Sequence, residues 1–233
     1  MRSGPRRKLL ARDGGLAVWR VDGHFIRDRL DVDFTNGSHD LVSRFVPANE
    51  IWLDREAPAA PGESGTGEWP LWLLFQLAHR RRMLAGASYL QALAVAERVE
   101  RQARRGALGG ERVDRGRAAV RAAALRGALG QEGGVRIFLV HGRAVRDRAY
   151  VHFTMGGHPR RYRFIPPGEV WIDAAGAPAE RAALVHHELV ELKLMEEEGL
   201  GYHEAHERAS AAELRFRRRA GRVGVAARVL SGR

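Results

Sequence analysis

The sequence predicts an α+β fold made by tandem duplication of one unit, a small antiparallel sheet followed by a helical hairpin. Three observations predict this fold. Residues 14–54 align with residues 133–173 at a constant offset of 119 without a gap, and 18 of the 41 pairs are identical. Each copy alternates short apolar stretches with turn residues, and each continues into two stretches of helical periodicity. The two copies are expected to pack about an approximate two-fold axis.

The strand pattern is clearest in the second copy. Val135–Val140 is apolar and Tyr150–Thr154 alternates in polarity, with turn residues between them. Tyr162–Ile165 and Glu169–Asp173 follow as two short strands, separated by a Pro-Pro-Gly turn. These four segments predict a small antiparallel sheet, and the aligned residues of the first copy predict another.

Two helices are expected after each sheet. In the second copy Ala179–Glu198 is periodic and stops at a glycine, and Tyr202–Arg219 forms the next helix. In the first copy the corresponding helices are Trp72–Ala85 and Tyr89–Arg105. They are reached through a Pro-, Gly- and Ser-rich linker at Ala57–Gly67, whose composition is typical of a flexible segment.

This pattern divides the chain into three parts. Residues 1–106 form the first repeat, which lacks the polar motif of the second repeat and is expected to serve as a scaffold. Residues 107–134 form a helical connector with a helix at Val113–Leu129 between glycine-rich segments. Residues 135–233 form the second repeat.

The first helix of the second repeat contains the sequence His-Glu-Leu-Val-Glu at residues 187–191. At 100° per residue, His187 and Glu191 lie about 40° apart, so both side chains can reach one ion. Glu188 lies beside them, where a general base would deprotonate water. All three residues fall within the apolar arc of the helix, and a buried carboxylate requires a compensating charge. A metal ion is one candidate, and an arginine such as Arg146 or Arg163 is the other.

His206 in the next helix is a further candidate ligand, because an antiparallel hairpin would turn it toward the first helix. At the positions of His187, Glu188, Glu191 and His206, the first copy has Phe75, Gln76, His79 and Leu93. Two of the four are large apolar residues, as expected when a polar site is lost and its space is filled with core.

Three other polar residues of the second copy are identical in the first. Tyr202, Glu213 and His158 correspond to Tyr89, Glu100 and His39. Because they persist in the copy that lacks the motif, a structural role is expected for them.

The order of elements resembles the core of zincin-type metallopeptidases. In that family an edge strand lines the substrate, two metal ligands come from a first helix and a third comes from a following helix. Glu169–Asp173 would be the edge strand. The resemblance implies that His187, Glu191 and His206 bind zinc, with Glu188 as the catalytic general base. It also implies a protein or peptide substrate.

The resemblance covers roughly residues 169–213 and departs from the family at one position. The family pattern is His-Glu-x-x-His, and this chain has Glu191 in place of the last histidine. A carboxylate there lowers the net charge of a zinc site and weakens its Lewis acidity. A degenerate site is therefore expected, and a buried polar network that locks the two helices to the sheet is the alternative.

Composition restricts the remaining function classes. The chain has no cysteine, so any metal would be held by imidazole and carboxylate, and a reducing cytoplasm fits. No apolar run is long enough to span a membrane, which indicates a soluble protein. The formal net charge of +11 favours an acidic partner such as nucleic acid, bound without base specificity through arginine clusters. A high-GC coding bias explains the arginines as well.

The preferred hypothesis is a zincin-like, metal-binding hydrolase site in the second repeat. Two alternatives stay open. In the first alternative, the protein is a basic, nucleic-acid-associated component. In the second, it is a structural module of an assembly or mobile element and has no activity of its own. Salt-dependent DNA binding that survives Glu188→Gln would indicate the former.

Overall fold

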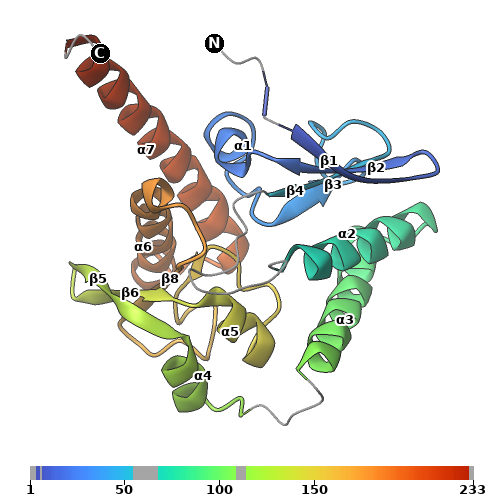
Figure 1. Ribbon diagram of the computed structural model, residues 1–233. Coiled ribbons are helices and arrows are strands. Elements are labelled where there is room, and N and C mark those ends of the chain that lie inside the picture. The colour runs from blue at the N-terminus through green and yellow to red at the C-terminus, as the bar shows by residue number, and fades with distance from the viewer. Residues whose placement is uncertain (1–3, 6, 55–67, 109–113, 231–233) are drawn as a thin grey trace.

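Two four-stranded mixed sheets, each followed by a helical hairpin, make up the protein (Figure 1). The computed structural model describes residues 4–5, 7–54, 68–108 and 114–230, with side chains up to residue 220. The architecture confirms the α+β class and the duplication. The linker expected at Ala57–Gly67 lies outside the described residues.

The first sheet has the strand order β1-β2-β4-β3. Its elements are β1 (Arg7–Asp13), β2 (Leu16–Val21), α1 (Gly23–Arg29), β3 (Gly37–His39) and β4 (Glu50–Asp54). β1 and β2 form an antiparallel hairpin, β4 runs parallel to β2, and β3 pairs antiparallel with β4.

The second sheet repeats this topology with the order β5-β6-β8-β7. It follows the connector helix α4 (Arg117–Ala124) and contains β5 (Leu125–Glu132), β6 (Val135–Val140), α5 (Gly142–Arg148), β7 (Gly156–Gly157) and β8 (Glu169–Asp173). β6 and β8 are parallel, and the outer pairs are antiparallel.

Three expectations about the sheets are corrected. The sheets are mixed instead of antiparallel, because α1 and α5 provide the crossover that lets the next long strand run parallel. Tyr150–Thr154 and Tyr162–Ile165 are not strands. The alternation in Tyr150–Thr154 instead reflects Val151 and Phe153, which point into the core from an irregular segment.

The connector is also shorter than expected. The helix expected at Val113–Leu129 ends at Ala124, and Leu125–Glu132 forms strand β5 of the second sheet. Gly127 and Gly130 lie in this stretch, where glycine disfavours continuation of a helix, and Gly130 adopts a positive φ of 155°. The residues expected to form the connector therefore include a strand of the second sheet.

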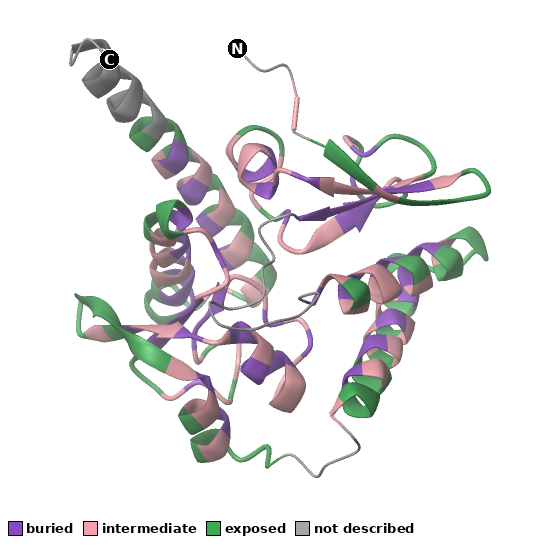
Figure 2. Cartoon of the chain, in the orientation of Figure 1, coloured by how far each residue is buried: buried purple, intermediate pink, exposed green. Residues whose placement is uncertain are grey.

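The helical hairpins match their expected positions closely. The first consists of α2 (Trp69–Leu84) and α3 (Tyr89–Ala107), and the second of α6 (Arg181–Glu197) and α7 (Tyr202–Leu230). A short 3-10 turn (Pro178–Glu180) precedes α6. Figure 2 shows the buried residues concentrated where the hairpins and sheets meet, whereas β1 and β5 are exposed.

Buried ion pairs join the two repeats reciprocally. Arg27 of α1 donates to both oxygens of Glu180, at the start of α6, with N–O distances of 2.6 Å. Its equivalent Arg146 of α5 donates to Glu68, which precedes α2. Each arginine also binds an aspartate of its own repeat, Asp54 or Asp173 respectively. Each hairpin is thus anchored to the short helix of the other repeat.

A second pair of arginines completes these inter-repeat ion clusters. Arg104 of α3 binds Glu68, Glu100 and the second repeat's Asp147, and Arg217 of α7 makes the same three contacts with Glu180, Glu213 and Asp28. Residue i of one repeat meets j of the other while j meets i, which is the signature of two-fold contact. The expected pseudo-two-fold axis follows from this reciprocity.

Replacing Arg146 with methionine is expected to lower the free energy of unfolding by about 3–5 kcal/mol, because Glu68 and Asp173 would be left buried without their cation. Urea denaturation followed by circular dichroism measures the loss. Arg148→Met on the same helix is the control and should change stability by less than about 0.5 kcal/mol. Equal losses in the two variants would contradict the role given to the cluster.

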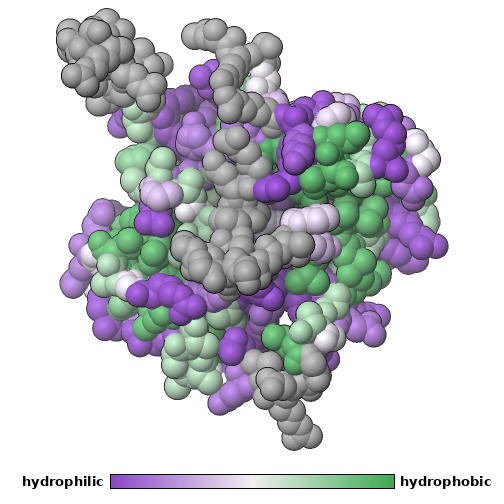
Figure 3. All heavy atoms as spheres, in the orientation of Figure 1, coloured by the Kyte–Doolittle hydropathy of each residue, from purple (hydrophilic) through white to green (hydrophobic). Residues whose placement is uncertain are grey.

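Apolar surface gathers on the first repeat. Figure 3 shows apolar side chains over the first sheet and α2. Of the exposed large apolar residues in the described parts of the chain, only Leu129 lies outside the first repeat. None of the described helices is both long and apolar enough to span a membrane.

Candidate metal centre

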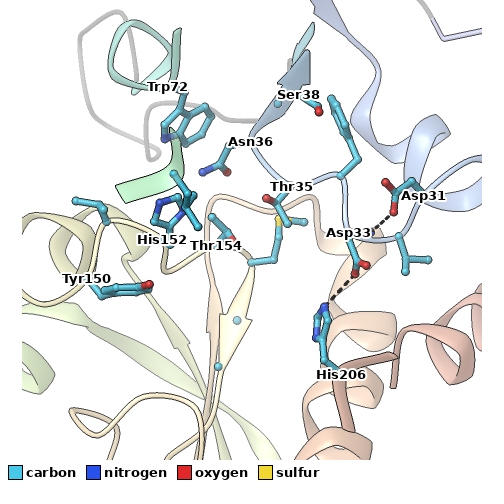
Figure 4. Close-up of a pocket in the computed structure, with 18 of the residues that line it drawn as sticks. Asp31, Asp33, Thr35, Asn36, Ser38, Trp72, Tyr150, His152, Thr154 and His206 are labelled. Carbon is cyan, nitrogen blue, oxygen red and sulfur yellow. Dashed lines mark hydrogen bonds and ion pairs between the residues drawn. The ribbon is translucent and has the colours of Figure 1, made fainter. Parts of the chain in front are cut away.

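A cavity of about 470 Å³ lies where the two repeats meet. Its walls come from Asp31–Ser38 of the first repeat, from residues 150–152 and 154–157 of the second, and from the facing sides of both hairpins. Figure 4 shows Thr35 and its equivalent Thr154 projecting from the two sides of this pocket. The His-Glu-x-x-Glu motif opens into the cavity on the side of α6.

The three expected ligands come together at this wall. His187 Nε2 lies 3.2 Å from His206 Nδ1 and 3.4 Å from Glu191 Oε2. His206 Nδ1 lies 2.7 Å from the same Glu191 oxygen. His187 and Glu191 come from one face of α6, and His206 comes from α7. The antiparallel hairpin brings the three together, as the helical spacing and the expected hairpin predict.

Two of these separations, 3.2 and 3.4 Å, fit a tetrahedral zinc ion, whereas the 2.7 Å between His206 Nδ1 and Glu191 Oε2 is a hydrogen-bond distance that an ion would have to widen. With zinc bonds of about 2.0–2.1 Å, two ligand atoms at neighbouring corners of a tetrahedron lie about 3.3 Å apart. The donor set, two imidazoles and one carboxylate that line the cavity, is the type found at catalytic zinc sites. The described His and Glu side chains can therefore hold a metal ion.

The outer nitrogen of each candidate imidazole ligand faces a carboxylate. His187 Nδ1 lies 2.9 Å from Glu213 Oε2, and Glu213 is held in turn by Arg217. His206 Nε2 lies 3.3 Å from Asp33 Oδ1, a contact drawn in Figure 4. Carboxylates in these positions fix the orientation of metal-binding imidazoles and increase their basicity. Asp33 belongs to the first repeat, so both repeats contribute to the site.

The second oxygen of Glu191 is also held in place. Fully buried His158 places Nε2 2.8 Å from Glu191 Oε1. His158, Glu188 and Glu191 form a second group whose ligand atoms could surround an ion. Neither His158 Nδ1 nor His187 Nδ1 makes a hydrogen bond, but the Glu213 carboxylate lies 2.9 Å from His187 Nδ1, whereas no described carboxylate forms an ion pair with His158 Nδ1. The first group therefore fits better.

Glu188 lies beside the ligands without being one of the first group. Its carboxylate packs against β7, where a Cβ on Gly156 would lie 2.8 Å from Glu188 Oε1. None of the described residues donates a hydrogen bond to it. Burial therefore dominates and raises the pKa of Glu188 to about 7, in the range suited to proton transfer near neutrality.

The electrostatic field at the cluster favours cations. Burial alone would lower the pKa of His187, but its contacts with Glu191 and Glu213 raise it to about 10. Burial would also lower the pKa of His206, but the contacts with Asp33 and Glu191 outweigh this effect and raise that pKa to about 9. Burial alone would raise the pKa of Glu191, but hydrogen bonds with His158, His187 and His206 hold it far below its ordinary value. A field that retains protons this strongly also favours a divalent cation that displaces them.

No arginine of the described residues forms a direct ion pair with the motif, and Arg161 attracts Glu191 only from a distance. No guanidinium lies within 4 Å of Glu188 or Glu191. Arg146 is engaged in the inter-repeat ion cluster, and the carbonyl of Arg163 accepts from Arg117 while its side chain is exposed. Neither of the arginines proposed from the sequence reaches the motif.

The first repeat preserves the framework of this site without its ligands. His79 occupies the position of Glu191, and its Nδ1 lies 2.8 Å from His39 Nε2, matching the His158–Glu191 contact. Gln76, at the position of Glu188, donates to the carbonyl of Gly37, the equivalent of Gly156. The register taken from the sequence therefore places equivalent side chains in equivalent surroundings.

His158 and Glu213, for which a structural role is expected, touch Glu191 and His187 directly, so this role includes holding two candidate ligands. One interpretation from the sequence is corrected by the sheet topology. Glu169–Asp173, expected to be an edge strand, is the inner strand β8, and β7 forms the edge next to α6. The edge strand was missed because Gly156–Gly157 reads as a turn in the sequence.

Comparison of the chain with protein-family models, with curated proteins and with solved structures finds no match in any of the three. The resemblance to zincin-type metallopeptidases therefore stays a prediction that rests on the motif and its geometry.

Replacing Asp33 with asparagine is expected to weaken zinc binding about 10- to 100-fold, because His206 would lose the carboxylate that orients it. Competition with a fluorescent zinc chelator measures the affinity. Asp31→Asn, in the same loop but without an imidazole contact, is the control. Equal affinities for Asp33→Asn and the wild type would show that the first repeat takes no part in the site.

Proposed function

We propose that the second repeat is a metal-dependent hydrolase that holds one zinc ion and cleaves peptide or similar amide bonds. The observation that supports this proposal is the cluster of His187, Glu191 and His206, whose donor atoms lie 2.7–3.4 Å apart at the wall of a cavity. The neighbouring carboxylate of Glu188 supplies the base that such a reaction requires.

Each residue has a distinct part in the proposed reaction. His187, Glu191 and His206 hold the zinc ion, which supplies the Lewis acidity that polarises the substrate carbonyl. Glu188 accepts a proton from the attacking water and returns it to the leaving nitrogen as the carbon–nitrogen bond breaks. One water is consumed, and an acid and an amine are released. His158 and Glu213 keep the ligands in position.

The same ligand set is compatible with iron. Two histidines and one carboxylate with open positions also hold Fe(II) in oxygenases. Glu188 favours hydrolysis, because an oxygenase site of this kind needs no additional carboxylate base at the metal. Elemental analysis of the purified protein separates the two metals.

The structure separates the arginines of the described residues into paired and exposed groups. Arg27, Arg104, Arg146 and Arg217 are consumed in the buried inter-repeat ion clusters, and Arg121 binds Glu169. Each of these contacts takes up a carboxylate as well as an arginine, so the ion clusters leave the formal net charge of +11 unchanged. The remaining exposed arginines are spread over several elements.

The direct test is a cleavage assay on untagged protein. Zinc-loaded protein and protein stripped with a chelator are incubated with a diverse peptide mixture, and products are identified by mass spectrometry. We expect cleavage only with zinc, and its return when zinc is added to the stripped protein. Zinc-bound protein that cleaves no peptide, or cleavage that survives chelation, would contradict the proposal.

A further inference from the structure

The wall of the cavity next to the ligands carries an unusual arginine. Arg161 follows β7 and lines the cavity together with Tyr162 and Tyr202. Its guanidinium lies 3.9 Å from the ring centroid of Tyr202 and 5.2 Å from that of Tyr162. Stacking on aromatic faces holds the planar cation in one orientation while leaving its edge available for hydrogen bonds.

This arginine forms no direct ion pair in the part of the chain that the structure describes, and the carboxylate of Glu191 attracts it only from a distance. No carboxylate lies within 4 Å of its guanidinium, and its Nε is buried without a hydrogen-bond partner. The other arginines buried between the repeats each bind two or three carboxylates. A half-buried guanidinium facing a cavity with an unpaired donor is a ready site for an anion of the substrate.

The first repeat provides an internal comparison. At the positions of Arg161 and Tyr162 it has Val42 and Ser43. Both of these residues also line the cavity, so the backbone framework is shared and only the side chains differ. The stacked guanidinium therefore occurs only in the repeat that carries the candidate metal ligands, which associates it with the chemistry of that site.

We propose that Arg161, oriented by Tyr162 and Tyr202, binds a carboxylate of the substrate beside the metal centre. This inference rests on the proposed function and narrows its substrate class to peptides with a carboxylate near the scissile bond. The planar fork of the guanidinium matches a carboxylate bidentately. The carboxylate belongs to an acidic side chain or to a free C-terminus, and the two sources share this chemistry.

Hydroxamates, which bind zinc directly, provide the probes. Succinic acid monohydroxamate presents a side-chain-like carboxylate, and malonyl-glycine hydroxamate presents a C-terminal one, and each is compared with its neutral primary amide. Calorimetry with zinc-loaded wild type should give at least about tenfold tighter binding for the acid of one pair. That pair identifies the source of the carboxylate.

Arg161→Gln should reduce the preference to within about twofold while leaving the affinity for the neutral amide unchanged. Arg160→Gln is the matched control, because it removes the same charge from the adjacent, exposed position and should keep the preference. Equal binding of acid and amide by the wild type in both pairs would overturn the inference and leave the proposed function standing.

If the proposed site does not hold zinc, the hydroxamate experiment gives a different result. If neither acid nor amide hydroxamate binds, the proposed function is wrong, and the arginine is then tested alone by titrating succinate into metal-free protein. Succinate binding that Arg161→Gln abolishes and Arg160→Gln retains would keep the anion site. Absence of succinate binding to the wild type would overturn it.

Discussion

Replacement of His187 by phenylalanine is expected to reduce bound zinc from about one ion per chain to a few per cent of that amount. His187 supplies one of three donor atoms, and loss of one leaves only Glu191 and His206, 2.7 Å apart, to hold the ion. Phenylalanine is chosen because Phe75 fills the equivalent position of the first repeat. Elemental analysis of untagged protein after dialysis against zinc measures the loss.

The neighbouring imidazole provides the control for this variant. His186 stacks on Phe216 with ring centroids 4.9 Å apart, and it is not among the residues that line the cavity. His186→Phe should therefore bind as much zinc as the wild type. Zinc should also raise the melting temperature of the wild type and of His186→Phe, but not of His187→Phe, because only a folded site binds the ion. Equal zinc in all three proteins would end the proposed metal centre.

The parts of the fold that the sequence predicts are those with local signals. The duplication is visible in identical residues, and the helical hairpins are bounded by a glycine or a serine cap. Strand β5 escaped prediction because its residues are largely exposed and include glycines, so it shows no alternation. Its conformation comes from pairing with β6, a tertiary contact that no local pattern encodes.

The reciprocal ion pairs between the two repeats could not be predicted from local sequence patterns either. Arg27 and Arg146 are identical in the alignment, but their partners Glu180 and Glu68 come from the opposite repeat and lie at the ends of helices. Only the packing of one hairpin against the other repeat brings them together. The sequence did contain one signal, since an arginine retained in both copies inside an apolar stretch needs a buried anion.

In the candidate site, too, local patterns predict some of the residues and miss others. Helical spacing predicts His187 with Glu191, and the hairpin adds His206. Asp33 and His158 could not be found this way, because they come from loops far away in the sequence and one of them from the other repeat. The comparison between copies predicts a structural role for His158 but does not show which residue it holds. The histidine contacts Glu191 in the second copy, and its equivalent His39 contacts His79 in the first.

Replacement of Glu188 by glutamine is expected to lower kcat/KM for peptide cleavage by about 10²–10⁴ while leaving the bound zinc unchanged. An amide cannot accept the proton of the attacking water, so the chemical step loses its base. The fold should tolerate the change, because Gln76 at the equivalent position donates to the carbonyl of Gly37 with an N–O distance of 2.9 Å. Gly156, the equivalent of Gly37, likewise lies against residue 188. Steady-state kinetics on the best peptide, together with elemental analysis, measures both effects.

The zinc content of this variant also decides between the two possible ligand groups. If the ion is held by His187, Glu191 and His206, Glu188→Gln keeps its zinc and loses only activity. If the ion is held by His158, Glu188 and Glu191, the same variant loses zinc and activity together, because an amide is a far weaker ligand than a carboxylate. Full activity in Glu188→Gln would exclude both the proton transfer assigned to this residue and its role as a ligand. Glu188→Asp separates the roles further, since a base one methylene shorter reaches water less well but still accepts its proton.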